Sequence, residues 1–358
     1  MFVFLPSTYS FSPSFPELPN PHSPELTSTL HPAVIELGMQ YASGEIRGGN
    51  ARCRAMLEVF LQVLEDYFPP ENIDFRIHFD HDVLKPSFTY WTTRCRPHSV
   101  SMGNAFTFVK TAVASLNREM PLAEAKETLQ DTIERYMQER MDFADKLIAQ
   151  HCLQKIEDGD VILTFGYSQV ISVLLQTAAK EKQRNFYVWV VDASPLWEGK
   201  KLMESLKEAD IPCGYIQLNA LTYVMQQVTK VFLGASALLS NGCVYGRVGT
   251  ASVALLAKDC HIPVLVCCET YKISNKVQLE SITNNELGNP DALIHEDTLA
   301  NWKETPNLTL LHLMYDVTPA EFVTGIVTEV GIIPPTSVAV LLREMNPQDA
   351  AYGSMTKD

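Results

Sequence analysis

The residues of this chain best suited to chemistry gather in one glycine-rich stretch, Asn241–Thr250, which reads NGCVYGRVGT. Its three glycines, Gly242, Gly246 and Gly249, come directly before a segment with a helical pattern. Because the first N–H groups of a helix have no partner within the helix, they bind anions well. The stretch is therefore a candidate phosphate site, although a structural turn without a ligand is the favoured interpretation.

Other glycine and polar positions follow further predicted strands. In an open α/β sheet, ligands bind at the carboxyl ends of the strands. We therefore treat six residues as the candidate remnant of a ligand pocket: Gly166, Ser236, Asn241, Arg247, Gly249 and Thr250. No cofactor is expected there, since a dinucleotide fingerprint needs three glycines after the first strand and FGYSQV offers one.

The sequence offers few groups of residues that could form a catalytic or metal-binding site. Ser168 lacks the GxSxG pattern of a nucleophile elbow, and a capping hydroxyl explains it. His78 and His81 stand beside Asp80 and Asp82, which superficially resembles a metal cluster, but a solvated, irregular insertion is preferred. The sequence predicts neither a catalytic residue nor a metal site.

Composition narrows the class of protein. The 358 residues allow about two domains. The net charge of −14 repels phosphate backbones, which excludes nucleic acid as a direct partner. The eight cysteines form no CxxC pair, so buried free thiols and the reducing cytosol are expected. No apolar run approaches the length of a membrane span, so no membrane partner is expected.

The second half of the chain has the pattern of a parallel sheet. Short apolar runs rich in valine and isoleucine predict buried strands at 161–166, 186–192, 211–218, 230–235 and 263–269. Helical patterns lie between most of them, at 168–182, 197–209, 219–227 and 247–259. This alternation predicts a Rossmann-like, doubly wound α/β domain over 158–345, with a final helix near 319–330.

The first half has the pattern of helices. One helix follows Asn50, its expected N-cap, a second spans about Ser99–Leu116, and a third runs from Pro121 to about Ile156. Residues 31–157 are therefore predicted to be an all-helical domain. The proline- and serine-rich residues 1–30 and the polar residues 346–358 are predicted to be disordered or loose tails.

Several long motifs carry a family resemblance. The stretches GDVILTFGYSQV, VVDASPLWEGKKL, LSNGCVYGRVGT, PVLVCCETYKIS and LMYDVTPAEFV closely resemble the delta subunits of eukaryotic translation initiation factor 2B. The match runs from about His31 to about Arg343. Methylthioribose-1-phosphate isomerases belong to the wider family and share its helical domain followed by a Rossmann-like domain.

The resemblance implies a function without catalysis. The expected protein is a regulatory subunit of the guanine nucleotide exchange factor for initiation factor 2, located in the cytosol. Its implied partners are the alpha, beta, gamma and epsilon subunits of that factor, and initiation factor 2 with its phosphorylated alpha subunit, which the regulatory core senses. A sugar-phosphate isomerase is the alternative.

The isomerase alternative meets a chemical obstacle. The resemblance aligns the isomerases' His-Cys pair with Phe165 and Gly166, and their Gly-Ala-Asp motif with Gly234-Ala235-Ser236. Glycine offers no nucleophile or acid, and a serine hydroxyl cannot shuttle protons as a carboxylate does. Both reactive groups of the isomerases are thus missing.

The resemblance also implies two recognition surfaces. Ile273, Leu311 and Leu313 match positions that line a small-molecule pocket between delta and beta subunits. Sensing of the phosphorylated partner is expected in the helical half, which needs a local basic patch to attract a phosphoserine. The available candidates are Arg52, Arg54, Arg94 and Arg96, with internal pairing to Glu58 or Asp66 as the alternative.

Overall fold

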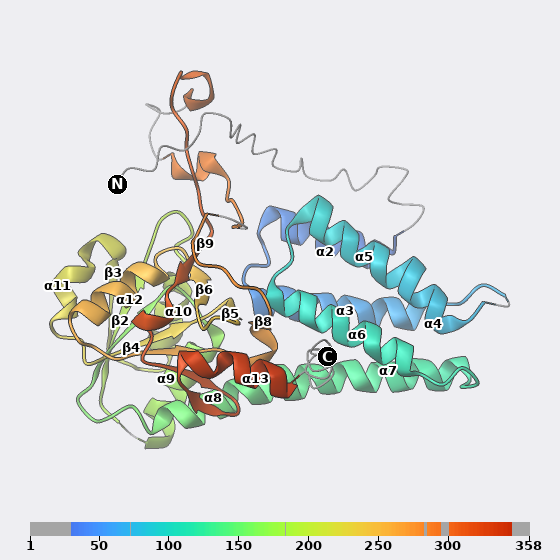
Figure 1. Cartoon of the computed structure of the whole chain (residues 1–358), viewed down its shortest axis with the longest axis horizontal. Coiled ribbons are helices and arrows are strands. Elements are labelled where there is room, and N and C mark those ends of the chain that lie inside the picture. Colours follow the sequence, from blue (N-terminus) through green and yellow to red (C-terminus); the bar gives the residue numbers. More distant parts are fainter. Residues whose placement is uncertain (1–29, 72, 183, 283–284, 295–300, 346–358) are drawn as a thin grey trace, which may run out of the picture.

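The computed structural model describes residues 30–345 except 72, 183, 283–284 and 295–300. The predicted tails therefore fall outside the described residues, apart from Leu30. A helical part and an α/β part lie side by side (Figure 1). Within the described ranges, every helix is too short or too polar to cross a membrane.

The helical part is built from short helices around an aromatic core. Its helices are α2 (Pro32–Ser43), α3 (Gly49–Asp66), α4 (Phe75–His78), α5 (Lys85–Tyr90), α6 (Val100–Ser115) and α7 (Leu122–Tyr136). The indole of Trp91 is buried between Tyr41 and Phe60, and its N–H donates to the Val34 carbonyl at 2.8 Å. The buried indole thus keeps a hydrogen bond, as a polar atom in a core requires.

Two local predictions in this part are wrong. Helix α3 begins one residue before Asn50, with Gly48 as its N-cap, because the Asn50 amide is engaged by the α/β part instead. The segment around His78 and His81 is not irregular, because α4 and α5 are joined by a π-helical turn, Phe79–Leu84, that buries Phe79 and Leu84. A second π-helical turn, Trp91–Cys95, ends α5.

The long predicted helix after Pro121 is confirmed in outline. Helix α7 continues through a π-helical turn, Met137–Asp142, into α8 (Phe143–Leu153), and the whole rod runs along both parts (Figure 1). Ile148 and Cys152 of α8 belong to the same buried cluster as Ile171 of the α/β part. The rod therefore contributes to both cores, so no simple linker separates the two parts.

The predicted Rossmann-like sheet is confirmed. Its strands are β1 (Val161–Phe165), β2 (Tyr187–Asp192), β3 (Cys213–Gln217), β4 (Lys230–Gly234), β7 (Val264–Cys267), β10 (Gly325–Thr328) and β11 (Gly331–Ile333). They lie in the order β11-β10-β7-β4-β1-β2-β3, and all adjacent pairs are parallel except β10 with β11. The strand order reverses between β1 and β4, which is where doubly wound folds place a ligand.

The sheet is flanked by the helices expected from the sequence. They are α9 (Gln169–Lys182), α10 (Gly199–Glu208), α11 (Leu221–Met225) and α12 (Thr250–Asp259), and the described chain closes with α13 (Val338–Met345). The helix predicted near 319–330 is wrong. Residues 325–328 are strand β10, which is buried on all four positions and paired with β7 on one side and β11 on the other.

A second, smaller sheet was not predicted from the sequence. Its strands are β5 (Ala237–Leu239), β6 (Val244–Arg247), β8 (Ile273–Ser274) and β9 (Tyr315–Thr318), in the order β8-β5-β6-β9. In Figure 1 it stands between the main sheet and the helical part. It places the glycine-rich stretch in a hairpin and brings residues from 237 to 318 together.

Candidate functional site

The first turn of α12, the candidate anion site, is occupied by a carboxylate of the chain itself. The N–H groups of Gly249 and Ala251 donate to Oδ2 of Asp316 at 2.7 and 3.0 Å. Burial raises the pKa of Asp316 to about 6, and these two N–H bonds oppose the rise. The structure thus shows the turn filled internally, in agreement with the interpretation that the sequence favoured.

Phe165 closes the same turn from the side of the main sheet. Gly249 has a φ of +111°, and a Cβ there would lie 2.6 Å from the Phe165 ring. Gly166, the next residue, ends β1 with a φ of +62° and donates its N–H to the Val191 carbonyl. A ring therefore fills the space at the carboxyl end of β1.

The remaining pocket candidates are partly brought together. Arg247 makes a bidentate ion pair with Glu198, at 2.9 and 2.6 Å, and its carbonyl accepts from the Thr250 hydroxyl. Ser236 is tied by its backbone to Tyr245 of β6. Asn241 sits at the opposite tip of the β5–β6 hairpin and donates to the Gln278 carbonyl, so it does not belong with the others.

A buried polar network joins the end of β7 to the helical part. Oε2 of Glu269 lies 2.5 Å from Nζ of Lys272, and Oε1 accepts from the Asn50 amide at 2.6 Å. The Tyr271 hydroxyl donates to the other side of the Asn50 amide at 2.7 Å. Lys272 and the amide hold the pKa of Glu269 below its usual range despite complete burial. Asn50 is thus a bridge between the two parts.

Asp145 of α8 completes this network from the helical rod. Burial and the neighbouring Glu269 raise the pKa of Asp145 to about 8. At neutral pH the pair therefore holds one proton and one negative charge, which Lys272 balances. A neutralised cluster of this kind holds the two parts together.

These contacts determine what the site can do chemically. The positions where an anion would bind carry Asp316 and Glu198, and each is bonded to donors of the chain. Gly166 offers no side chain where the resemblance aligns a catalytic cysteine. Around α12, these side chains of the described residues therefore bond to one another and are not arranged as a nucleophile with its acid or base.

Glu198, Glu286 and Asp316 were missed by sequence reasoning. Their partners are Arg247, Arg96 and the N-terminus of α12, and each partner lies 49 or more positions away in the chain. No local motif signals such a pairing.

The four arginines proposed for sensing do not form one surface cluster. Arg52 is 1% exposed and donates to the Pro97 carbonyl, so burial rules it out as a contact for a partner. Arg54 pairs with Asp142, and Arg96 pairs with Glu286 at 2.6 Å. Internal pairing, the alternative to sensing, therefore occurs for Arg54 and Arg96, but with Asp142 and Glu286 in place of Glu58 or Asp66. Arg94 is exposed.

The three residues proposed for an intersubunit pocket also differ in exposure. Ile273 is 3% exposed and belongs to the core beneath the second sheet, where β8 pairs with β5. It is therefore corrected to a core residue. Leu313 is half-buried and forms a bridge with Leu287, whereas Leu311 is 49% exposed.

An exposed apolar surface does exist next to these residues. Residues 285–288 run antiparallel to residues 312–315. We call this pair, together with the adjoining residues 277–282 and 308–311, the apolar ribbon. Besides Leu311, it exposes Val277 (64%), Leu279 (82%) and Ile282 (55%). Large exposed apolar side chains on one ribbon are typical of an interface.

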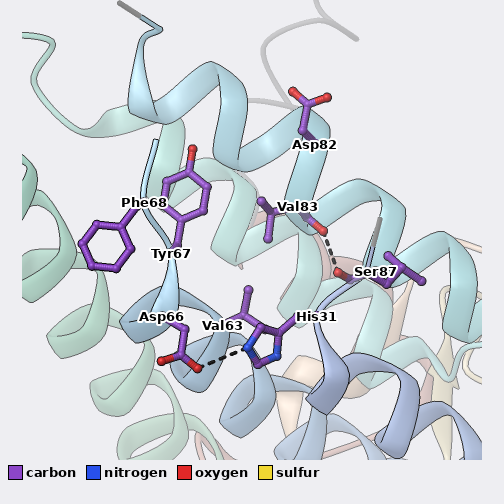
Figure 2. Close-up of a pocket in the computed structure, with 9 residues that line it drawn as sticks. His31, Val63, Asp66, Tyr67, Phe68, Asp82, Val83 and Ser87 are labelled. Atoms are coloured by element: carbon purple, nitrogen blue, oxygen red, sulfur yellow. Dashed lines mark hydrogen bonds and ion pairs between the residues drawn. The ribbon is translucent and has the colours of Figure 1, made fainter. Parts of the chain in front are cut away.

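Two pockets of the described chain lie away from these residues. One of about 250 Å³ opens at the outer end of the helical part, beside the His31–Asp66 pair and the rings of Tyr67 and Phe68 (Figure 2). Another lies between α6 and α7, beside Phe108 and Leu129. Neither contains a residue predicted to bind a ligand.

Metal ligands are not assembled in the part of the chain that the structure describes, where no three histidine, cysteine or acidic side chains come together. His78 instead shares a hydrogen bond of 2.7 Å with the Tyr67 hydroxyl.

A helical part followed by a doubly wound sheet in the order β11-β10-β7-β4-β1-β2-β3 defines the class: a Rossmann-like α/β protein with a helical N-terminal part. The sequence profile described as the initiation factor 2 subunit family matches residues 45–335. This chain belongs to that family.

The resemblance to delta subunits is confirmed by the relatives. Over 88% of its length, the chain is 40% identical to translation initiation factor eIF2B subunit delta of Schizosaccharomyces pombe and 41% identical to that of Dictyostelium discoideum. It spans 69% of the first relative and about half, 51%, of the second.

Solved structures and enzymes complete the comparison. A chain from the crystal structure of the tetrameric eIF2B-beta2-delta2 complex of C. thermophilum superposes with a TM-score of 0.75 at 32% identity, covering 85% of this chain and 94% of that one. Ribose 1,5-bisphosphate isomerase of Thermococcus kodakarensis is 31% identical over 87% of this chain and 94% of the enzyme. The chain is thus grouped with the factor subunits, which match at higher identity than the enzyme.

Proposed function

We propose that this chain is a non-catalytic regulatory subunit of translation initiation factor 2B, the guanine nucleotide exchange factor for initiation factor 2. The observation that carries the proposal is the apolar ribbon, because Val277, Leu279, Ile282 and Leu311 are all exposed there. Several exposed apolar side chains close together in the chain are typical of a surface that binds another protein.

The closed switch point supports a role without catalysis. Asp316 fills the first turn of α12, Phe165 covers it, and Gly166 has no side chain to react. An isomerase would need this space open for its substrate. The lack of a reactive side chain at Gly166 and the filled turn of α12 both favour a role without catalysis.

A beta-type subunit is the partner we assign to the ribbon. A relative with 32% identity occurs in a complex described as beta2-delta2. Leu311 and Leu313 lie in the ribbon and keep their proposed place at a contact between subunits, which Ile273 loses. The alpha, gamma and epsilon subunits would complete the complex in the cytosol.

Sensing of phosphorylated initiation factor 2 alpha is the second element of the proposal. Of the four arginines, Arg94 is exposed and Arg54 is partly exposed in an ion pair with Asp142. These two are the residues available to a phosphorylated partner, since Arg52 and Arg96 are occupied inside the chain. A phosphoserine prefers such exposed guanidinium groups.

The proposal is tested by reconstituting the factor with and without this chain and measuring GDP release from initiation factor 2. We expect the isolated chain to release no GDP and to convert no ribose 1,5-bisphosphate. We expect the complex that contains it to be inhibited by the phosphorylated factor, and inhibition to be lost without it. Turnover of the sugar phosphate by the isolated chain would refute the proposal.

A further inference from the structure

One ion pair fastens the apolar ribbon to the helical part. Nε of Arg96 donates to Oε1 of Glu286 at 2.6 Å, although 190 positions separate the two residues. The side chains are 11% and 13% exposed. Arg96 stands at the end of the π-helical turn that closes α5, so the bond links a rigid element to a long connection between β8 and β9.

Glu286 is also a central point of the ribbon. Its carbonyl accepts from the Met314 N–H at 3.0 Å. The neighbouring Asn285 exchanges two hydrogen bonds with the backbone of Tyr315, and Gly288 donates to the His312 carbonyl at 2.8 Å. Fixing Glu286 therefore holds 285–288 against 312–315, next to Leu311 and Leu313.

The negative charge of Glu286 acts on two guanidinium groups, those of Arg96 and Arg52. Burial and the nearby Arg96 lower the pKa of Arg52, while Glu286 and Tyr315 oppose this shift. Arg52 is fully buried, so without Glu286 two like charges would face each other with little solvent. Glu286 is thus held at this position more firmly than an exposed carboxylate would be.

We infer that Arg96 and Glu286 are positioning residues for subunit assembly: they hold the apolar ribbon in its binding shape before the partner arrives. This inference rests on the proposed function, because it assigns the ribbon to a beta-type subunit. A preordered surface loses less conformational freedom on association than a loose one. The pair therefore strengthens assembly without touching the partner.

The test compares three variants of the full chain with a matched control. Arg96→Ala removes the pair, Arg96→Lys keeps the charge, and the exchange Arg96→Glu with Glu286→Arg restores the pair in reverse. Lys85→Ala is the control, since it breaks an ion pair with Asp80 in the same helical part, away from the ribbon. Two quantities are measured: backbone hydrogen exchange of 277–288 in the isolated chain, and the Kd for a purified beta-type subunit.

For Arg96→Ala, we expect faster exchange in 277–288 and a Kd raised about tenfold, which corresponds to ordering a few side chains on binding. Arg96→Lys and the charge exchange should recover most of both losses, and Lys85→Ala should change neither. Unchanged exchange and affinity in Arg96→Ala would overturn the inference. A general loss of protection, including α3 and the main sheet, would overturn it as well, because the pair would then stabilise the fold and not the ribbon.

The two proposals can fail separately. If the wild-type chain does not bind a beta-type subunit, the proposed function fails, whereas the exchange measurement still reports on the pair. If the wild type binds and Arg96→Ala binds equally well, only the positioning role is refuted.

Discussion

Asp145 makes the stability of this protein depend on pH in an unusual direction. In the unfolded chain its carboxyl loses its proton near pH 4, whereas burial beside Glu269 raises its pKa in the folded chain to about 8. Between these values the folded state binds more protons than the unfolded state. The contribution of Asp145 to stability is therefore complete below pH 4 and is lost as the pH rises to 8.

We predict that Asp145→Asn removes this loss. Its Tm relative to wild type should rise by several degrees between pH 5 and pH 9, since a pKa raised from about 4 to about 8 links roughly 4 kcal/mol of stability to that pH range and each kcal/mol shifts Tm by a few degrees. Thermal unfolding followed by circular dichroism at both pH values measures it. Asp131→Asn, at an exposed position of α7, is the control. A Tm difference that does not change with pH would contradict the raised pKa.

The residues of the site show how far sequence reasoning reaches. The stretch Asn241–Thr250 could be found because glycines before a helix are a local signal. The groups that fill it could not, because Asp316 and Glu198 reach it from 67 and 49 positions away. Arginine is usually a surface residue, so the sequence does not show that Arg52 is buried. Only the fold does, where Arg52 donates to the Pro97 carbonyl.

Helix α12 depends on Asp316 for its N-terminus. Two of its first N–H groups have this carboxylate as their acceptor. We predict that Asp316→Ala lowers the free energy of unfolding by about 1–2 kcal/mol, as does the loss of a helix cap. Asp316→Asn keeps one acceptor oxygen and should lose less.

Urea denaturation of both variants measures the effect on α12. If the alanine variant is as stable as wild type, the N-terminus of the helix is satisfied in another way. An equal loss in both variants would show that the charge, and not the hydrogen bonds, stabilises the turn.

Among the elements, those with a strong local period were predictable. The continuous apolar runs of β1, β2, β4 and β7 indicated buried parallel strands, and the apolar stripe of the α7–α8 rod indicated a long helix. The second sheet escaped because its strands have two to four residues, too few to show a period. The helix predicted near 319–330 failed for a related reason: pairing with β7 decides the conformation of Gly325–Thr328, and that partner lies 60 positions away.

In the assembled factor, Arg94 is the residue that tests sensing most cleanly. It is exposed in the helical part, whereas its neighbour Arg96 positions the ribbon. We predict that Arg94→Ala reduces the inhibition of GDP release by phosphorylated initiation factor 2 about threefold, the loss expected for one exposed charge contact. Release without the phosphorylated factor should stay unchanged.

Exchange assays on the reconstituted complex measure this prediction, with Arg135→Ala on α7 as a matched control at another exposed arginine. Equal inhibition in wild type and Arg94→Ala would assign sensing to other residues of the complex.

Assembly through the apolar ribbon is the central claim, and one measurement addresses it directly: native mass spectrometry of this chain mixed with a purified beta-type subunit. Wild type should give a complex with two copies of each chain, the composition of the related beta2-delta2 complex. Leu279→Asp should abolish it, because a carboxylate would be desolvated in an apolar contact. Leu255→Asp, at an exposed leucine of α12, should leave the complex intact. A wild-type chain that stays unbound, or a Leu279→Asp variant that assembles as wild type does, would contradict the account.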